Sequence, residues 1–332
     1  MPQRKRGRQK AVSPQPENSV RLSTAHSARV FSAGGHCFTW VEVVEWARAR
    51  GEWRSLQQRV GALLAREREL AAAAALPSAP EVQAAADNFR DRYKLLTADE
   101  LEEWLDRYDV SVEEWKGEML RSLLEPSGDT LAVSPDVVER ACWVHGVCSG
   151  KLAAYARTLA EEIAVHLCDQ PLTLGPDELA GLPEKRERFC ADQLRPAVLA
   201  AEIADNKVGW TRLDLQCLIH RDEMVAREAA LCVRLDRREL ADVAADAGAE
   251  LHEISLLLDD AEPLLRTRLR AANPGELIGP VAIGGDYQLV LVVGRVAPSL
   301  DDSAVRLRAE ETVIKRALAA EVNRHVNWHE RL

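Results

Sequence analysis

Residues 273–297 of this chain read NPGELIGPVAIGGDYQLVLVVGRVA and contain the most informative pattern in the sequence. Two runs rich in strand-forming residues, 277–283 and 287–293, flank the Gly-Gly-Asp triplet at 284–286. Glycines between two such runs are typical of a tight turn, because glycine adopts positive φ without steric cost. The stretch therefore predicts a β-hairpin.

Upstream residues complete a small domain around this hairpin. Leu213, Leu215 and Cys217 alternate with Asp214 and Gln216, which is the two-residue period of a strand. The other expected elements are a strand at 251–258 and helices at 222–235, 238–247 and 263–272. Together they predict a four-stranded α+β domain over 209–297.

The rest of the chain is predicted to be mostly helical. Helix-capping spacing recurs where Thr39, Thr97 and Ser111 each stand three residues before a glutamate. The expected organisation is a basic tail over 1–28, a helical module with an N-terminal hairpin over 29–168, a linker and helix over 169–208, and a C-terminal helix over 298–332 that packs on the N-terminal module. The fold class expected for the whole chain is therefore α+β and mostly helical.

Composition limits the class of protein. The 332 residues carry 43 Lys and Arg against 53 Asp and Glu, a formal net charge of −10, and the seven cysteines are an odd, scattered set. Charged residues interrupt every apolar run before it reaches the roughly 18–20 residues of a membrane span, and no apolar core of a secretion signal follows the basic tail. We expect a cytoplasmic protein with reduced thiols that binds neither nucleic acid nor membranes.

Local motifs in 209–297 carry a family resemblance. This part of the chain resembles the parvulin-type peptidyl-prolyl isomerase domain through four motifs that occur in the same order. They are Leu240-Ala241-Asp242-Val243-Ala244, the segment 273–281, the segment 286–290 and Arg295. The surrounding hairpin and helices resemble SurA-type and PrsA-type foldases, in which such helices form a peptide-holding chaperone module. The whole chain more closely resembles the isomerase-related proteins of bacterial systems that mature ribosomally made (RiPP) peptides. This resemblance rests on residues 298–302 and 326–328.

The resemblance implies a site around paired histidines, one in the first strand and one in the last. Gln288 stands at the last-strand position, and Gln216 or Cys217 stands at the first, so both histidines are absent there. Residues 249–253 also replace the family's glycine-rich loop. The nearby His220 is an alternative, displaced histidine. The implied domain is a degenerate isomerase without catalytic residues, whose apolar groove is flanked by Leu264, Leu265 and Gln288.

An acidic, aromatic-bearing region provides a second candidate surface. Acidic residues between 99 and 118 are interleaved with Trp104 and Trp115. Amphipathic helices with solvated outer faces explain the pattern. The alternative is a groove in which the carboxylates steer a basic or apolar peptide and the tryptophans anchor it.

No metal or cofactor site is expected from the sequence. Cys142, His145 and Cys148 are spaced three residues apart on a predicted helix, so their side chains do not all lie on one face as a metal site requires. His325 and His329 lack the glutamate of a zinc-helix motif. Phosphate-binding loops and nucleophile elbows are absent from the sequence.

The functional expectation is a non-enzymatic, peptide-binding chaperone-like protein. It would hold a precursor or unfolded peptide, in extended form along the sheet groove or within the helical module, for the enzymes of a maturation pathway. The first alternative is an active peptidyl-prolyl cis/trans isomerase and foldase whose pocket is rebuilt around Gln288 and His220. The second is a structural adaptor that contacts folded enzymes.

Overall fold

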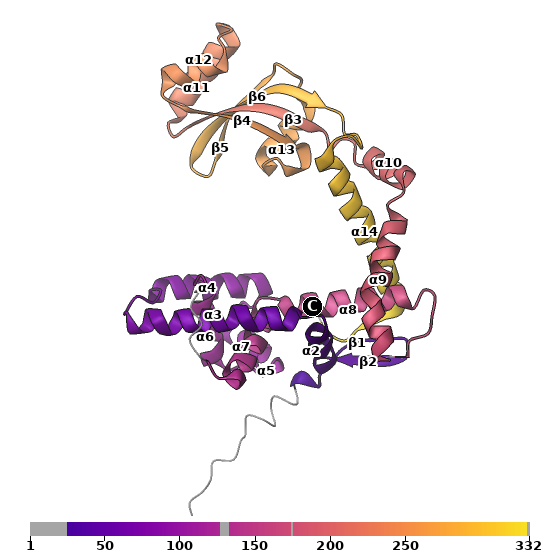
Figure 1. Ribbon diagram of the computed structural model, residues 1–332. Helices are drawn as coiled ribbons and strands as arrows, with labels where there is room; N and C mark the ends of the chain where they lie inside the picture. The colour runs from indigo at the N-terminus through magenta and orange to yellow at the C-terminus, as the bar shows by residue number, and fades with distance from the viewer. Residues whose placement is uncertain (1–24, 127–132, 174, 331–332) are drawn as a thin grey trace, which may run out of the picture. The chain divides into compact units, whose positions relative to one another are not determined.

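The computed structural model describes residues 25–126, 133–173 and 175–330 (Figure 1). They form two compact units, of which the first is drawn from Met1–Glu187 and Leu318–Leu332 and the second is Arg188–Ala317. The mostly helical α+β class expected from the sequence is confirmed. Residues 1–24 of the expected basic tail lie outside the described residues.

The first unit contains a small antiparallel sheet with the order β2-β1-β7. The predicted hairpin is confirmed as β1 (Arg29–Ala33) and β2 (His36–Thr39), with Gly34 and Gly35 both at positive φ in the turn. Positive φ favours glycine at both positions because it has no Cβ.

Helices make up the remainder of this unit. Their bounds are α2 (Trp40–Ala49), α3 (Glu52–Ala72), α4 (Ala79–Tyr93), α5 (Ala98–Arg107), α6 (Val112–Arg121), α7 (Pro135–Cys148) and α8 (Lys151–His166). The capping boxes predicted at Thr39, Thr97 and Ser111 are present at the starts of α2, α5 and α6. One hydrophobic core joins these helices to β1 and contains fully buried Trp53 and Trp143.

The segment expected to be a linker is helical instead. The prolines and glycines of 169–188 predicted an irregular boundary, followed by one helix over 187–207. In the structure α9 (Pro176–Gln193) runs through Pro183, and a separate α10 (Pro196–Asp205) follows. Leu182 is fully buried in the core of the first unit, and this packing outweighs the cost of a proline within the helix.

The end of the chain also differs from the prediction. The last helix was expected to continue to Trp328, but α14 (Ser303–His325) stops earlier and Val326–Trp328 forms β7. Trp328 pairs with Phe31 of β1, and the two ring centroids are 5.3 Å apart. This long-range aromatic contact favours strand over helix for the last residues.

The second unit is built around an antiparallel sheet with the order β4-β3-β6-β5, so the predicted four-stranded sheet is confirmed. Besides α10 and the first part of α14, this unit contains β3 (Arg212–His220), α11 (Glu223–Leu235), α12 (Leu240–Ala247), β4 (Glu250–Leu257), a 3₁₀ turn η1 (Leu258–Asp260), α13 (Pro263–Ala271), β5 (Leu277–Ile283) and β6 (Asp286–Val296). The first strand, β3, is central and pairs with both β4 and β6.

Different helices pack on the two faces of this sheet. Leu218 and Leu289 point to the face on which α11 and α12 pack. Cys217 and Val290 point to the other face, where they share a core with Leu265 of α13. A strand rises about 3.3 Å per residue and a helix about 1.5 Å, so β3, β4 and β6 extend further than the nine-residue α13. Exposed residues of β4 continue this second face beyond its buried core. We call the second face the site face.

Candidate functional site

The site face brings together residues from four elements. In an antiparallel pair, residues directly opposite one another share a face. Cys217 pairs with His252 of β4 on one side and with Val290 of β6 on the other, and Ile219 pairs with Gln288. Cys217, His252 and Gln288 therefore lie on one face of three adjacent strands.

The structure decides between the two first-strand residues that the sequence left open. The Cys217 thiol donates a hydrogen bond to Oε1 of Gln288 at 3.7 Å. Gln216 points to the opposite face, where its Nε2 donates to Oε1 of Glu253 at 3.4 Å. Of the residues predicted to replace the paired histidines, Cys217 and Gln288 meet, and Gln216 does not join them.

The two leucines expected to flank the groove differ in exposure. Leu265 is buried in the core beneath α13, whereas Leu264 is 60% exposed. Ile254 extends the apolar surface on β4 and is 38% exposed. The site face thus has a buried floor, a half-buried Gln288 on β6, and exposed apolar residues on β4 and α13.

His252 is the residue of the site face that sequence reasoning missed. It lies directly across from Cys217, is about half exposed, and its Nε2 is 3.2 Å from Oε2 of Glu250. The sequence contained its signal only indirectly. The pairing register of β4 against β3 determines its position, and that register involves residues some 35 positions apart in the chain.

The displaced histidine considered from the sequence has a different role. His220 pairs with Tyr287, which places it on the opposite face from Gln288. Its Nδ1 accepts a hydrogen bond from the backbone N–H of Asp222 at 2.9 Å, within the turn that precedes α11. The alternative of one pocket built around both Gln288 and His220 is therefore wrong, because the two side chains lie on opposite faces of the sheet.

The electrostatics of the site face do not favour a nucleophilic cysteine. Burial raises the pKa of the Cys217 thiol above its usual value of 9.0. The thiol therefore stays protonated at neutral pH and acts as a hydrogen-bond donor to Gln288. A thiolate nucleophile requires the opposite shift of the pKa.

The two tryptophans singled out from the sequence lie in the first unit. Trp115 is 6% exposed and belongs to the core, with its ring centroid 5.8 Å from that of Phe89. Trp104 is half-buried and lines a cavity of about 420 Å³ together with Tyr93 and Tyr108. Trp104 thus borders a cavity, whereas Trp115 is a core residue.

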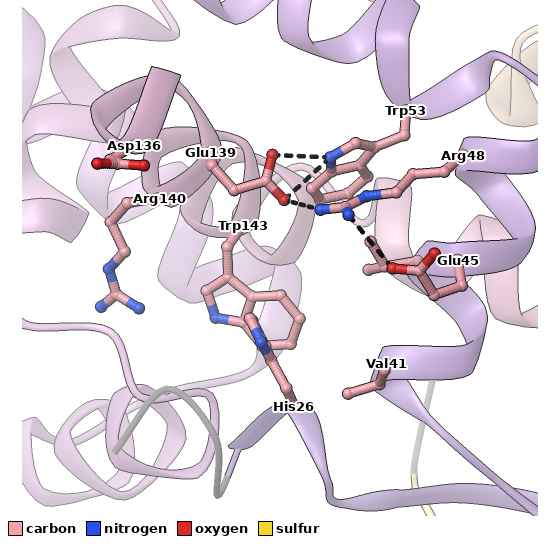
Figure 2. Close-up of a pocket in the computed structure, with 10 residues that line it drawn as sticks. His26, Val41, Glu45, Arg48, Trp53, Asp136, Glu139, Arg140 and Trp143 are labelled. Atoms are coloured by element: carbon pink, nitrogen blue, oxygen red, sulfur yellow. Dashed lines mark hydrogen bonds and ion pairs between the residues drawn. The ribbon is translucent and has the colours of Figure 1, made fainter. Parts of the chain in front are cut away.

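A second cavity of about 330 Å³ in the first unit was not predicted. Figure 2 shows Trp143 and Trp53 beside Arg48 and Glu139, with His26 against Trp143. Glu139 accepts hydrogen bonds from Nε1 of Trp53 at 3.1 Å and 3.2 Å. Burial, followed by the charge of Arg140, lowers the pKa of His26, so its ring is neutral at pH 7.

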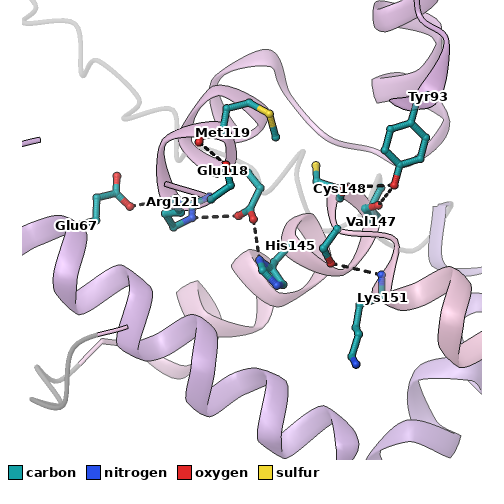
Figure 3. Close-up of polar contacts among 11 residues, drawn as sticks. Glu67, Tyr93, Glu118, Met119, Arg121, His145, Val147, Cys148 and Lys151 are labelled. Carbon is teal, nitrogen blue, oxygen red and sulfur yellow. Dashed lines mark hydrogen bonds and ion pairs between the residues drawn. The ribbon is translucent and has the colours of Figure 1, made fainter. Parts of the chain in front are cut away.

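The cysteines and histidine considered as a zinc helix are held by other interactions. Cys142 and Cys148 are buried, and burial raises the pKa of the Cys142 thiol to about 12. Nδ1 of His145 is 2.7 Å from Oε1 of Glu118, and Oε2 of the same carboxylate accepts a hydrogen bond from Nε of Arg121 (Figure 3). His145 thus belongs to a buried ionic network within the helices.

No helix of the described residues combines the length and apolar character needed to cross a membrane.

Comparison with known proteins gives similarity to solved structures alone. No protein-family model and no curated protein matches the chain. Among solved structures, it is similar to one from Campylobacter jejuni, described as that of the virulence factor PEB4 and the periplasmic protein Cj1289, two structurally related SurA-like chaperones. The similarity covers 91% of this chain and 100% of that chain, with 10% sequence identity and a TM-score of 0.19. A TM-score of this size supports no conclusion about function.

Proposed function

We propose that this protein is a chaperone-like protein that binds peptide segments on the site face of its second unit, without a chemical step. One observation carries the proposal: the site face, which holds Gln288 beside Cys217, leaves Ile254 of β4 38% exposed, and Leu264 of the covering helix α13 is 60% exposed. Exposed apolar surface beside a polar, hydrogen-bonding group is typical of a recognition site.

The site face suits an extended peptide. The Gln288 amide offers both a donor and an acceptor to a peptide bond, and its Oε1 already accepts from the Cys217 thiol. Successive side chains of an extended peptide point to opposite sides, so every second one faces the protein. Exposed Ile254 and Leu264 can contact these side chains. The buried, protonated thiol contributes an apolar floor rather than a reactive group.

A titration with matched variants tests this proposal. A fluorescently labelled, apolar, proline-containing peptide is titrated with the full chain, with Ile254→Ser and with Leu264→Ser. Losing one partly buried aliphatic contact costs about 1 kcal/mol, so each variant is expected to weaken binding about 5-fold. The control is Leu235→Ser, which changes a 73% exposed leucine of α11. Equal weakening by the control, or no binding at tens of micromolar, would refute the proposal.

The proposed client is a ribosomally made precursor peptide that the protein presents to maturation enzymes in the cytoplasm. Support for this finer step comes from the sequence alone, through the resemblance of 298–302 and 326–328 to proteins of such systems. Retention of a modifying enzyme on the immobilised protein only in the presence of its precursor peptide would be the expected result. Retention without the peptide would favour a structural adaptor.

A second function, prolyl isomerisation, is favoured by the position of His252. The family resemblance implies a site on adjacent strands with histidines, and His252 faces Cys217 on the same face as Gln288. Rotation about an Xaa-Pro bond needs no nucleophile, only a polar pocket that stabilises the twisted amide against a barrier of about 18–20 kcal/mol. Accelerated cis/trans exchange that His252→Ala abolishes would establish this function in place of simple binding.

A further inference from the structure

Three side chains with different metal-binding groups meet in the first unit, away from the cavities described above. Cys168 follows the end of α8, while Glu321 and His325 lie one turn apart on α14. Among the described residues these three are grouped so that one ligand atom of each lies within 4.8 Å of the others. Positions i and i+4 share a helix face, so Glu321 and His325 present their side chains together.

The separations suit a tetrahedral metal ion. Sγ of Cys168 is 3.2 Å from Oε2 of Glu321, and Nε2 of His325 is 3.7 Å from the same oxygen. Ideal zinc bonds of about 2.3 Å to sulfur and 2.0–2.2 Å to nitrogen and oxygen give tetrahedral edges of about 3.3–3.6 Å. Each of the two distances is therefore within about 0.4 Å of its ideal edge, which small side-chain rotations can correct.

The combination of donors selects the metal. A thiolate, an imidazole and a carboxylate are the three protein ligands that Zn²⁺ commonly takes, whereas Mg²⁺ and Ca²⁺ prefer oxygen alone. The Glu321 side chain is 13% exposed and that of His325 is 23% exposed, whereas Cys168 is exposed, so a metal ion can reach the three ligands from solvent.

We propose that Cys168, Glu321 and His325 form a Zn²⁺ site that fastens the last turn of α14 to the end of α8. Three protein ligands leave the fourth position for water or another small ligand. No local pattern in the sequence points to this site, because Cys168 and Glu321 are 153 residues apart. From the sequence, His325 was considered as a metal ligand only together with His329, and Nε2 of His329 lies 3.2 Å from Oγ of Ser32.

One neighbouring cation opposes metal binding and offers an internal control. Nη1 of Arg324 donates to Oε2 of Glu321 at 2.8 Å, and the Arg324 side chain is 65% exposed. A bound Zn²⁺ takes over this oxygen, and the exposed guanidinium can move into solvent. Removing Arg324 should therefore strengthen zinc binding, since both the competing donor and a like charge are lost.

The experiment is a titration of the full reduced chain with Zn²⁺ against a chromophoric chelator, paired with Co²⁺ absorption spectra. We expect one ion per chain, with thiolate-to-cobalt charge-transfer bands that Cys168→Ser abolishes. Cys168→Ser and His325→Ala should each weaken Zn²⁺ binding at least about 10-fold, and Arg324→Ala should strengthen it. The control Cys232→Ser changes a thiol on α11 in the second unit and should leave affinity and spectrum unchanged.

Three results would overturn the site: no stoichiometric binding, binding that survives Cys168→Ser, or weaker binding after Arg324→Ala. Far-ultraviolet circular dichroism of each variant separates loss of a ligand from loss of the fold. Arg324→Ala keeps the proposal testable even if a ligand variant unfolds, because Arg324 is largely exposed and is not a proposed ligand.

Discussion

Replacing the buried Glu118 by glutamine should strongly destabilise the first unit. Glu118 is 3% exposed, and its two carboxylate oxygens accept from Nε of Arg121 at 3.2 Å and contact Nδ1 of His145 at 2.7 Å (Figure 3). The substitution keeps the shape of the side chain and removes its charge. A donating amide group then faces a cationic donor or an imidazole in a site without bulk water.

The magnitude follows from the contacts that remain. Removing one partner of a buried ion pair costs about 3–5 kcal/mol, because the other charge stays buried without compensation. Here Nη1 of Arg121 also donates to Oε2 of Glu67 at 3.1 Å, so part of the compensation survives. We therefore expect the lower end of the range, about 3 kcal/mol, or a fall in Tm of about 6–12 °C.

Intrinsic fluorescence is the appropriate assay. Seven of the eight tryptophans belong to the first unit, and Trp210 alone belongs to the second, so thermal unfolding followed by tryptophan emission reports mainly on the first unit. The control is Glu113→Gln, an exposed glutamate of the same helix, for which a change within about 0.5 kcal/mol is expected. A loss below about 1 kcal/mol for Glu118→Gln would refute the reasoning that this carboxylate is an essential buried partner.

Three further substitutions test other parts of the structure. His26→Gln should reduce the loss of stability on acidification. The folded-state pKa of His26 is lowered below 6.5, so its contribution to stability is present above pH 6.5 and is lost as the pH falls below that value. The free energy of unfolding, plotted against pH, should therefore change less in the variant. Gly146→Ala should cost about 1–3 kcal/mol in urea unfolding, because the new Cβ would lie 2.9 Å from Cγ of the buried Leu152; an unchanged midpoint would contradict the tight packing of α7 on α8. Thr97→Ala should cost about 1 kcal/mol, since the Thr97 side chain accepts from the N–H of Glu100 at 3.2 Å, and retention of full stability would show that this cap is dispensable.

Local chemistry made much of the fold predictable. The capping boxes at Thr97 and Ser111 begin α5 and α6 as expected, because the side-chain oxygens that satisfy free N–H groups lie within four residues. The alternation around Cys217 predicted β3 for a similar reason, since period two needs no knowledge of the partner strand.

Features that depend on distant residues were not predictable in this way. The core position of Leu182 keeps α9 helical through Pro183, and the pairing of Trp328 with Phe31 turns the end of the chain into a strand. Neither partner can be inferred from sequence neighbours. Tertiary packing therefore overrides local propensity at both places.

The candidate site likewise combines residues that local sequence predicted with residues that only strand pairing identified. The sequence predicted Gln288 at the last-strand position and left Gln216 and Cys217 as alternatives, because a register error of one residue moves a side chain to the opposite face. The pairing of β3 with β6 resolved that choice in favour of Cys217. His252 required the additional register of β4 against β3, which no local pattern supplied.

NMR exchange spectroscopy of an apolar proline-containing peptide, recorded with and without the full chain, reports both binding and catalysis. Peptide binding on the site face without a chemical step predicts broadened or shifted peptide signals, weaker with Ile254→Ser, and an unchanged rate of cis/trans exchange. Unperturbed peptide signals at tens of micromolar protein would contradict binding. Accelerated exchange would contradict the absence of a chemical step and would establish a prolyl isomerase.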